Sequence, residues 1–214
     1  DANLLTVDIV CHGVPSQTLF DEYVKETETQ HNAKVVWAEF RYTQDFDKKN
    51  PNPRALKLYF DNGNCVAYTM AESEFLYAYY TGLLYRPSCE VCKFACPSRP
   101  GDITLGDYWG IEKIYPELNS LRGVSLLHFN TEKGKFLMPF FEESGILKET
   151  DWKFACAENN QLTYPTVPHR NRDKFFKQRL RGIGFCENVR RCKKPDTLLQ
   201  KILRKLRLFL FKRP

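Results

Sequence analysis

Apolar and polar residues follow one another along the chain in blocks that predict short strands and helices in turn. The first apolar run, LLTVDIVC at residues 4–11, is rich in β-branched side chains and predicts a buried strand, which the turn residues HGVPS then end. Residues 16–30 have helical spacing, with Ser16 as the N-cap. The apolar face of this helix is formed by Leu19, Phe20 and Tyr23.

The next two apolar runs, residues 33–43 and 55–69, alternate with a period of two and predict strands. A loop rich in Pro and Asn separates them at residues 44–54. Within the second run, DNGN at residues 61–64 predicts a hairpin, because Asn-Gly suits the left-handed backbone of a type I′ turn. Residues 72–85 then predict an aromatic-rich helix that leads into a cluster of cysteines.

The second half of the chain continues this alternation. Residues 102–111 predict a strand that ends in a glycine-bracketed loop, and residues 123–144 predict a strand, a turn and a helix. Residues 162–176 form a proline-broken linker into a helix, and residues 195–214 predict an amphipathic basic helix. Together these elements predict an α/β (mixed α+β) fold, in which a central mixed sheet has flanking helices and a C-terminal amphipathic helix.

We expect one domain over residues 1–168 and a basic helical C-terminal extension over residues 169–214. The net charge is +6, and much of the excess lies in that extension. A basic tail serves nucleic acid, an anionic membrane surface or solubility. The chain has no recognised nucleic-acid motif, so nucleic acid is not expected as a partner. The terminal helix has two interpretations, an interfacial helix on a membrane surface and an amphipathic helix folded onto the domain.

No stretch of the chain approaches the roughly 20 apolar residues that a membrane-spanning helix needs. The opening residues DANLLTVDIV also lack the basic start and the cleavage site of a signal peptide. We therefore expect a cytoplasmic protein, with contact to the inner membrane only at its periphery. Because the chain opens without a methionine and directly on a predicted strand, it is interpreted as an N-terminally truncated fragment.

Three cysteines lie within eight residues, at Cys89, Cys92 and Cys96. The spacing Cys89-x-x-Cys92 places two sulfurs on one tight turn, which can chelate one metal ion or two corners of a cluster. Pro97 follows Cys96, so the run C-x2-C-x3-C-P shares part of the ferredoxin pattern. The pattern favours an iron–sulfur cluster, with zinc and structural or redox thiols as the alternatives. Four scattered cysteines are interpreted as small buried or tolerated thiols: Cys65, Cys156, Cys186 and Cys192.

Two further stretches carry candidate chemistry. VCHGVPS, at residues 10–16, places a Cys and a His on the loop after a buried strand, where an α/β fold usually carries its site. The alternative is a turn with a buried Cys and a surface His. GDITLGDYWGI, at residues 101–111, holds glycines that would let backbone amides approach a ligand, notably Gly106 and Gly110. The alternative interpretation of residues 101–111 is the end of a strand with an exposed acidic residue.

These three features stand in this order and are followed by PHRNRDKFF at residues 168–176. As an ordered set they resemble the coenzyme F-420 hydrogenase/dehydrogenase beta-subunit family, and more narrowly its C-terminal domain. The resemblance covers almost the whole chain and points to a bacterial member. It implies an oxidoreductase that binds FAD and a 4Fe-4S cluster. Such proteins pass electrons between the cluster and a deazaflavin (coenzyme F-420) or another carrier.

The resemblance also assigns site residues. Cys11, Cys89 and Cys92 match the family's cluster cysteines, and Cys96 is an addition that is either a fourth metal ligand or a bystander. A further family cysteine lies upstream, in a GTPCQ-type loop that this chain lacks, which agrees with a truncated chain. The residues expected at the cofactors are His12, Gly13, Arg41, Gly106, Asp107 and Trp109. Arg41 is interpreted as facing a phosphate or an acidic substrate, or as a surface arginine on a strand. No catalytic acid or base is assigned.

The expected partners are an electron-carrier protein or ferredoxin-like domain and a small-molecule substrate. Two other functions stay open. One is a generic flavin and iron–sulfur reductase linked to polysaccharide biosynthesis, acting on a sugar or a polyprenyl-linked intermediate. The other is a cofactor-free interaction or scaffold subunit, which iron and flavin content would distinguish from an enzyme.

Overall fold

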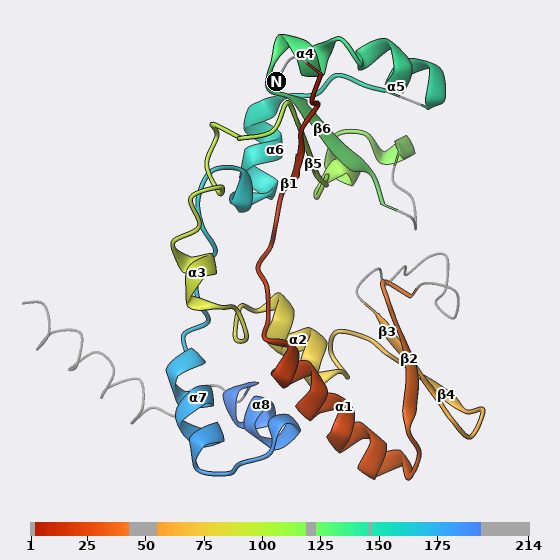
Figure 1. Cartoon of the computed structure of the whole chain (residues 1–214), viewed down its shortest axis with the longest axis vertical. Coiled ribbons are helices and arrows are strands. Elements are labelled where there is room, and N and C mark those ends of the chain that lie inside the picture. Colours follow the sequence, from red (N-terminus) through yellow and green to blue (C-terminus); the bar gives the residue numbers. More distant parts are fainter. Residues whose placement is uncertain (1–2, 43–54, 119–122, 146, 194–214) are drawn as a thin grey trace, which may run out of the picture.

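The strands form two sheets that lie at opposite ends of the molecule (Figure 1). The structure is a computed structural model and describes residues 3–42, 55–118, 123–145 and 147–193. Its strands are β1 (Val7–Ile9), β2 (Val35–Phe40), β3 (Leu56–Phe60), β4 (Cys65–Tyr68), β5 (Ile103–Asp107) and β6 (Ser125–Phe129). Within the described residues, one three-stranded sheet has the order β1-β5-β6 and the other the order β2-β3-β4.

Helices lie beside each sheet, so that the chain forms two lobes (Figure 1). The helices are α1 (Gln17–His31), α2 (Glu74–Tyr80), α3 (Pro87–Glu90), α4 (Glu132–Lys135), α5 (Met138–Ser144), α6 (Trp152–Glu158), α7 (Arg172–Leu180) and α8 (Phe185–Lys193). We call β2, β3 and β4 with α1, α2, α7 and α8 the antiparallel lobe. The mixed lobe consists of β1, β5 and β6 with α4, α5 and α6.

The antiparallel lobe has the larger core. In β3, Leu56, Leu58 and Phe60 alternate with more exposed residues, and each is at most 4% exposed. They share one core with side chains of α1, α2, α7 and α8, including Val189, which is fully buried. This burial explains why the period-two pattern of the sequence becomes a strand here, because one face of the sheet is covered by helices.

The mixed lobe is built on the pairing of β1 with β5 in parallel, which sets Asp8 opposite Thr104. β6 pairs with β5 in the antiparallel direction. A smaller core lies against this sheet and consists of Tyr108, Ile111, Leu126, Ala155 and Leu162. The parallel pair joins residues about a hundred positions apart in the chain, so the N-terminal strand depends on the middle of the sequence for its partner.

The predicted α/β class is confirmed, and the structure contains a mixed sheet. The prediction did not separate a second, antiparallel sheet from it. The hairpin predicted at residues 61–64 is confirmed, because β3 and β4 are antiparallel. The predicted type I′ turn is wrong, because Gly63 has a φ of +83° but the φ of Asn62 is not positive. The predicted helix at residues 16–30 is also confirmed as α1, with Ser16 at the N-cap, although the Ser16 side chain makes no capping hydrogen bond.

Two predictions fall on parts of the chain that the structure does not describe. These are the Pro/Asn-rich loop at residues 44–54 and the amphipathic helix at residues 195–214, which lie outside the described residues. The described part of the extension, residues 169–193, contains α7 and α8, which pack in the core of the antiparallel lobe. The domain boundary at residue 168 stays a prediction. In the part of the chain that the structure describes, no helix is long and apolar enough to cross a membrane.

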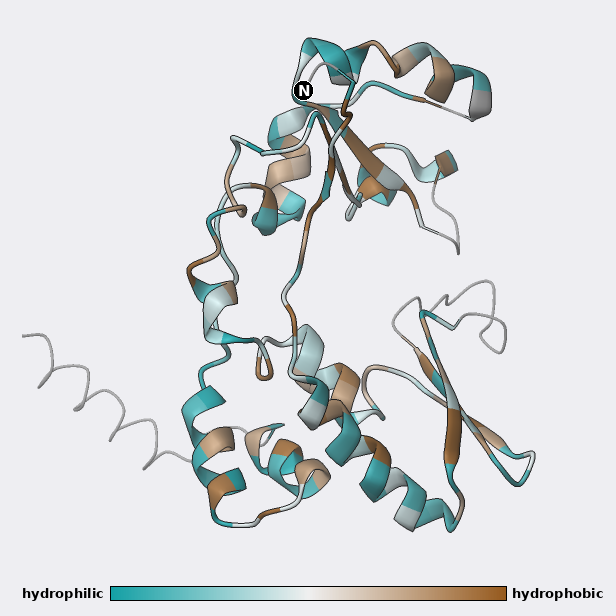
Figure 2. Ribbon diagram, viewed as in Figure 1, coloured by the Kyte–Doolittle hydropathy of each residue, from teal (hydrophilic) through white to brown (hydrophobic). Residues whose placement is uncertain are grey.

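Apolar side chains also lie exposed on two edge strands, where Figure 2 shows brown segments. On β1, Val7 is 50% and Ile9 65% exposed, and on β2, Val36 is 62% and Trp37 65% exposed. Both strands end their sheets within the described residues. Burial of these side chains therefore contributes little to the stability of either strand. In the antiparallel sheet, the buried face of β3 contributes more to stability than the exposed side chains of β2 do.

This difference in burial predicts that two substitutions to alanine lower the free energy of unfolding by different amounts. Leu58→Ala should lower the free energy of unfolding by about 2–5 kcal/mol, because it leaves a cavity in the core. Val36→Ala on the neighbouring strand should change the free energy of unfolding by at most about 0.5 kcal/mol, as exposed substitutions usually do. Urea unfolding followed by circular dichroism measures both, and equal losses would contradict the assignment of the core.

Candidate functional site

The two cysteine-bearing segments of the sequence lie side by side. Pro15 forms an isolated antiparallel bridge with Tyr85, and the backbone N–H of Arg86 donates to the carbonyl of Val14 at 3.1 Å. The backbone N–H of Val14 in turn donates to the Cys89 sulfur at 3.4 Å. The loop that follows Cys11 is therefore held directly against the start of the cysteine cluster, as the adjacent backbone groups satisfy one another.

Gly13 makes this close approach possible. Its φ is +137°, a conformation that L side chains rarely adopt. A Cβ at this position would lie 2.7 Å from Cδ1 of Tyr85, which is itself only 1% exposed. Both the backbone conformation and the packing thus require glycine. Gly13 was predicted at a cofactor site, and the structure gives it a definite role in packing the loop against Tyr85.

His12 lies in a group of aromatic rings. Its ring centroid is 5.3 Å from Trp109 and 5.6 Å from Tyr85, and Tyr79 and Tyr80 also lie within 6.2 Å. His12 Nε2 is 3.4 Å from the carbonyl oxygen of Tyr80. Among the described residues, His12 Nδ1 and the Tyr85 hydroxyl are buried without hydrogen-bond partners. Polar atoms of this kind usually have a partner, so these two are candidates for contact with a ligand.

Two of these tyrosines have perturbed acidities. Burial raises the pKa of Tyr85 far above its usual value and also raises the pKa of Tyr79. Both side chains are protonated at neutral pH, as tyrosines ordinarily are, and the raised pKa values keep them protonated at more alkaline pH as well. Their hydroxyl groups are available as hydrogen-bond donors rather than as bases.

Arg41 and Asp107 form a forked ion pair that joins the two lobes. Arg41 follows β2, while Asp107 ends β5, and Nη1 of the arginine donates to Oδ1 of the aspartate at 3.1 Å. The second bond runs from Nη2 to Oδ2, and this hydrogen bonding raises the pKa of Arg41. The arginine side chain is 63% exposed and the aspartate 42%, so the pair is solvated and contributes little to stability. Sequence analysis had placed both residues at the cofactors, and the structure brings them together.

Arg41 also has an unusual backbone. Its φ is +60°, in the left-handed region that few residues other than glycine occupy. Such a conformation costs about 1–3 kcal/mol and persists where the surrounding structure enforces it. The next residue, Tyr42, supplies such a restraint, because it is buried and its backbone N–H donates to the carbonyl of Ala55 at 3.3 Å.

The glycines of the 101–111 stretch have packing roles. A Cβ on Gly106 would lie 2.9 Å from Cγ2 of Val10, so this glycine allows β1 and β5 to approach. A Cβ on Gly110, where φ is +75°, would lie 2.7 Å from Oε2 of Glu158. Neither observation places a ligand at these amides, and their predicted contact with a cofactor stays a prediction.

The cysteines themselves are free thiols. Cys11 is exposed, and Cys89, Cys92 and Cys96 are partly buried. The Cys96 sulfur lies 3.1 Å from the carbonyl oxygen of Ser98 and 3.4 Å from that of Lys93, which turns its thiol toward its own loop. Within the described part of the chain, no three His, Cys, Asp or Glu side chains lie close enough together to hold a metal ion.

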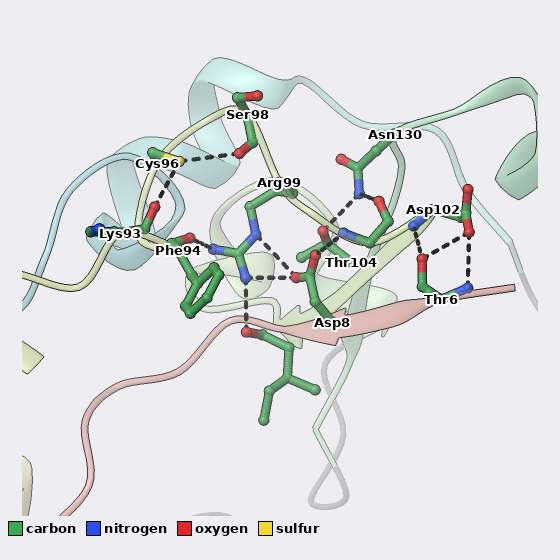
Figure 3. A network of polar contacts seen from close by, with 12 residues as sticks. Thr6, Asp8, Lys93, Phe94, Cys96, Ser98, Arg99, Asp102, Thr104 and Asn130 are labelled. Atoms are coloured by element: carbon green, nitrogen blue, oxygen red, sulfur yellow. Dashed lines mark hydrogen bonds and ion pairs between the residues drawn. The ribbon is translucent and has the colours of Figure 1, made fainter. Parts of the chain in front are cut away.

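A buried arginine that sequence analysis did not single out holds the cysteine loop against β1 (Figure 3). The guanidinium of Arg99 donates to the carboxylate of Asp8 through Nε at 3.0 Å and through Nη2 at 2.6 Å. It also donates to the carbonyl oxygens of Ile9 and Phe94. The available signal in the sequence was Asp8 itself, a carboxylate inside an otherwise apolar strand.

Asp102 anchors the same region from the other side (Figure 3). Its carboxylate accepts hydrogen bonds from the backbone N–H of Thr6 at 2.9 Å, the Thr6 hydroxyl at 2.8 Å and the Thr131 hydroxyl at 2.8 Å. The bonds from the Thr6 backbone, from Thr131 and from the Thr6 hydroxyl hold the pKa of Asp102 well below its usual range. Asp102 is therefore a structural carboxylate of the mixed sheet rather than a proton donor.

With this geometry in place, comparison with known families identifies the chain. The family that matches, over residues 1–153, is described as the C terminus of the beta subunit of coenzyme F420 hydrogenase/dehydrogenase. The chain belongs to this family. No curated protein and no solved structure matches it significantly. The matched range contains the predicted site residues from Cys11 to Trp109 and ends before α7.

Membership in this family confirms the resemblance drawn from the sequence. It gives the chain a redox role of the F420 hydrogenase/dehydrogenase beta-subunit type, and a beta subunit works with partner subunits. The match covers both cysteine segments, the aromatic residues around His12 and the pair of Arg41 with Asp107. It therefore covers all of the predicted site residues that the structure brings together.

The fit of Gly13 against Tyr85 can be tested with a matched pair of substitutions. Gly63→Ala should cost about 1–2 kcal/mol, since only the left-handed backbone opposes it and no atom lies within 4 Å of the added Cβ. Gly13→Ala should lower the free energy of unfolding by more than Gly63→Ala does, because steric overlap with the ring of Tyr85 adds to the strain of the left-handed backbone. The measurement is urea unfolding, together with amide hydrogen exchange at Val14. A similar cost for both variants would contradict the packing role of Gly13.

Proposed function

We propose that the chain carries the cofactors of a flavin- and iron–sulfur-dependent oxidoreductase subunit. Cys11, Cys89 and Cys92 are the ligands of a 4Fe-4S cluster, with Cys96 as the fourth candidate. FAD lies close to His12, Gly13, Arg41, Gly106, Asp107 and Trp109. Electrons pass between the cluster, FAD and coenzyme F420 or another carrier. The observation that carries this proposal is the hydrogen bond from the Val14 N–H to the Cys89 sulfur.

The chemistry of the donor set fits a cluster. Thiolates are the usual ligands of iron–sulfur clusters, and backbone N–H groups that donate to their sulfurs help to set the reduction potential. The Val14 N–H supplies one such donor to Cys89, and it comes from the loop that begins with Cys11. Since the thiols do not converge in the described conformation, the cluster itself would draw them together, as metals do in sites that form only on binding.

Cys96 is the weakest member of this set. Its thiol has two carbonyl oxygens within reach, those of Lys93 and Ser98, and it would have to leave both and lose its proton to bind iron. Cys89 instead accepts a hydrogen bond at its sulfur, which a thiolate does better than a thiol. We therefore expect Cys96 to contribute less to cluster binding than Cys89.

The aromatic group around His12 fits an organic cofactor. His12 Nδ1, the Tyr85 hydroxyl and the side-chain oxygen of Asn159 are buried polar atoms without partners among the described residues. Arg41 presents a planar fork that matches a phosphate or a carboxylate, and its exposed pair with Asp107 can open at little cost. When bound, FAD supplies the hydride and single-electron chemistry, while the chain orients it and excludes water.

The partner of such a subunit would approach the cysteine loop. Val91 is 74% exposed and Phe94 60% exposed, and both lie in the segment from Cys89 to Cys96. Exposed apolar side chains in one place are typical of an interaction surface. Docking of an electron-carrier protein or a ferredoxin-like domain there would shorten the path between its redox centre and this one. The deazaflavin is the proposed small-molecule substrate.

The proposal predicts which thiols hold iron. The chain is reconstituted anaerobically with iron, sulfide and FAD, and iron, sulfide, bound flavin and visible absorption are measured. Cys11→Ser, Cys89→Ser and Cys92→Ser should each lose most of the bound iron and sulfide, because serine is a poor ligand for these clusters. Cys96→Ser should retain a larger share than Cys89→Ser.

The control is Cys65→Ser, since this cysteine is exposed on β4 in the antiparallel lobe. It should match the unmodified chain in iron content. A folded chain that stays colourless and free of iron after reconstitution would overturn the cluster proposal and favour a cofactor-free interaction subunit. Iron that is lost equally in all five variants would refute the ligand assignment.

A further inference from the structure

We propose that Arg99 is the positioning residue that holds the two cysteine-bearing segments next to one another, so that ligation requires only a local movement of the thiols. This inference rests on the proposed function, because it concerns the geometry of the proposed ligands. It also makes a statement about the chain without its cofactors, which can be tested separately. Neither the family match nor the spacing of the cysteines assigns a role to this arginine.

The contacts of Arg99 reach both segments at once. On one side, Nη2 donates to the carbonyl oxygen of Ile9 at 2.8 Å, two residues before Cys11. On the other side, Nη1 donates to the carbonyl oxygen of Phe94, which lies between Cys92 and Cys96. One rigid guanidinium plane therefore fixes the separation of two stretches that are more than eighty residues apart in the sequence (Figure 3).

Asp8 fixes the guanidinium in turn. The Asp8 carboxylate accepts from Arg99 through Oδ1 and from the backbone N–H of Gly101 through Oδ2 at 2.9 Å. Gly101 is required at this point, since a Cβ there would lie 2.8 Å from the same Oδ2. Because Asp8 belongs to β1, which is paired with β5, the arginine is tied to the sheet of the mixed lobe.

Burial makes this contact directional and hard to replace. The Arg99 side chain is 3% exposed and the Asp8 side chain 18%. A buried charge needs all of its hydrogen bonds satisfied, and only the forked geometry of arginine reaches the carboxylate and two carbonyl groups together. A lysine retains the charge but presents one compact ammonium group, which cannot span the same acceptors.

The consequence for ligation follows from preorganisation. A loop that is already held beside the segment that carries its partner ligand loses less conformational entropy when it binds than a loop that is free to move. Arg99 restrains the stretch that carries Cys92 and Cys96 relative to the stretch that ends at Cys11. A substitution of Arg99 would leave every cysteine present and would raise the entropic cost of bringing the cysteines together. Residues that orient metal ligands in this way typically contribute about 10- to 100-fold to metal affinity.

The test compares Arg99→Lys with a matched control. Arg179 forms a similar forked ion pair with Glu22 between α7 and α1, in the antiparallel lobe and away from both cysteine segments. The Arg179 side chain is 36% exposed, so Arg179→Lys reports the effect of exchanging arginine for lysine in a forked but more solvated pair away from the cysteines. Asp8→Asn is a second variant, which keeps the size of the side chain and removes the charge that holds Arg99, in case Arg99→Lys fails to fold.

Four measurements are made on the full chain. Thermal unfolding establishes that each variant is folded. Amide hydrogen exchange, measured without cofactors, covers residues 8–16 and 86–101. Release of iron to a chelator is followed by visible absorption after anaerobic reconstitution with iron and sulfide, and electron paramagnetic resonance of the reduced cluster reports its surroundings, which a loss of stability alone would not alter.

We expect Arg99→Lys and Asp8→Asn to exchange faster in both stretches, to lose iron about tenfold faster or more, and to show an altered resonance spectrum. Arg179→Lys should match the unmodified chain in hydrogen exchange of both stretches, in the rate of iron loss and in the resonance spectrum. The inference is overturned if folded Arg99→Lys retains iron as well as Arg179→Lys, or if only one stretch exchanges faster. If the unmodified chain holds no iron, the proposed function fails, and hydrogen exchange alone then decides whether Arg99 positions the two stretches.

Discussion

The candidate site depends on the contact between the loop after Cys11 and the segment that precedes Cys89. Both are irregular stretches, and they meet through the bridge of Pro15 with Tyr85 and through the hydrogen bond from the Arg86 N–H to the Val14 carbonyl. Gly13 allows the contact by leaving room for the ring of Tyr85. The Val14 N–H then meets the Cys89 sulfur, so that the chemistry of the cysteine cluster and the conformation of the loop are set by the same few residues.

Local patterns in the sequence predicted the elements of the fold well where one face is buried. The alternation in β3, the Asn-Gly hairpin and the spacing of α1 all describe interactions within about twenty residues. The division into two sheets was not predictable in this way. Whether β1 pairs with β5 or with β2 depends on contacts across about a hundred residues, and a period-two pattern carries no information about which strand is its partner.

The candidate site shows the same limit. Motif order located Cys11, His12, Cys89 and Asp107, and the structure brings the loop of His12 and the cysteine segment together. The structure also joins Arg41 with Asp107, which no spacing in the sequence could indicate. Arg99 went unnoticed, since an arginine beside a proline in a loop looks like a surface residue until its burial against Asp8 is known. The sequence also contains no signal for the orientation of the Cys96 thiol, which the carbonyl groups of Lys93 and Ser98 in its own loop set.

The two arginine–aspartate pairs differ in a way that suits their positions. Arg99 and Asp8 are buried, so breaking the pair would strand a charge in the interior and the arrangement stays fixed. Arg41 and Asp107 are largely solvated, so water compensates for their separation and the pair can open. The buried pair lies beside the cysteine segments, where the proposed cluster would need constant geometry. The exposed pair lies at the aromatic group around His12, where the proposed function would have an anionic group compete with Asp107 for Arg41.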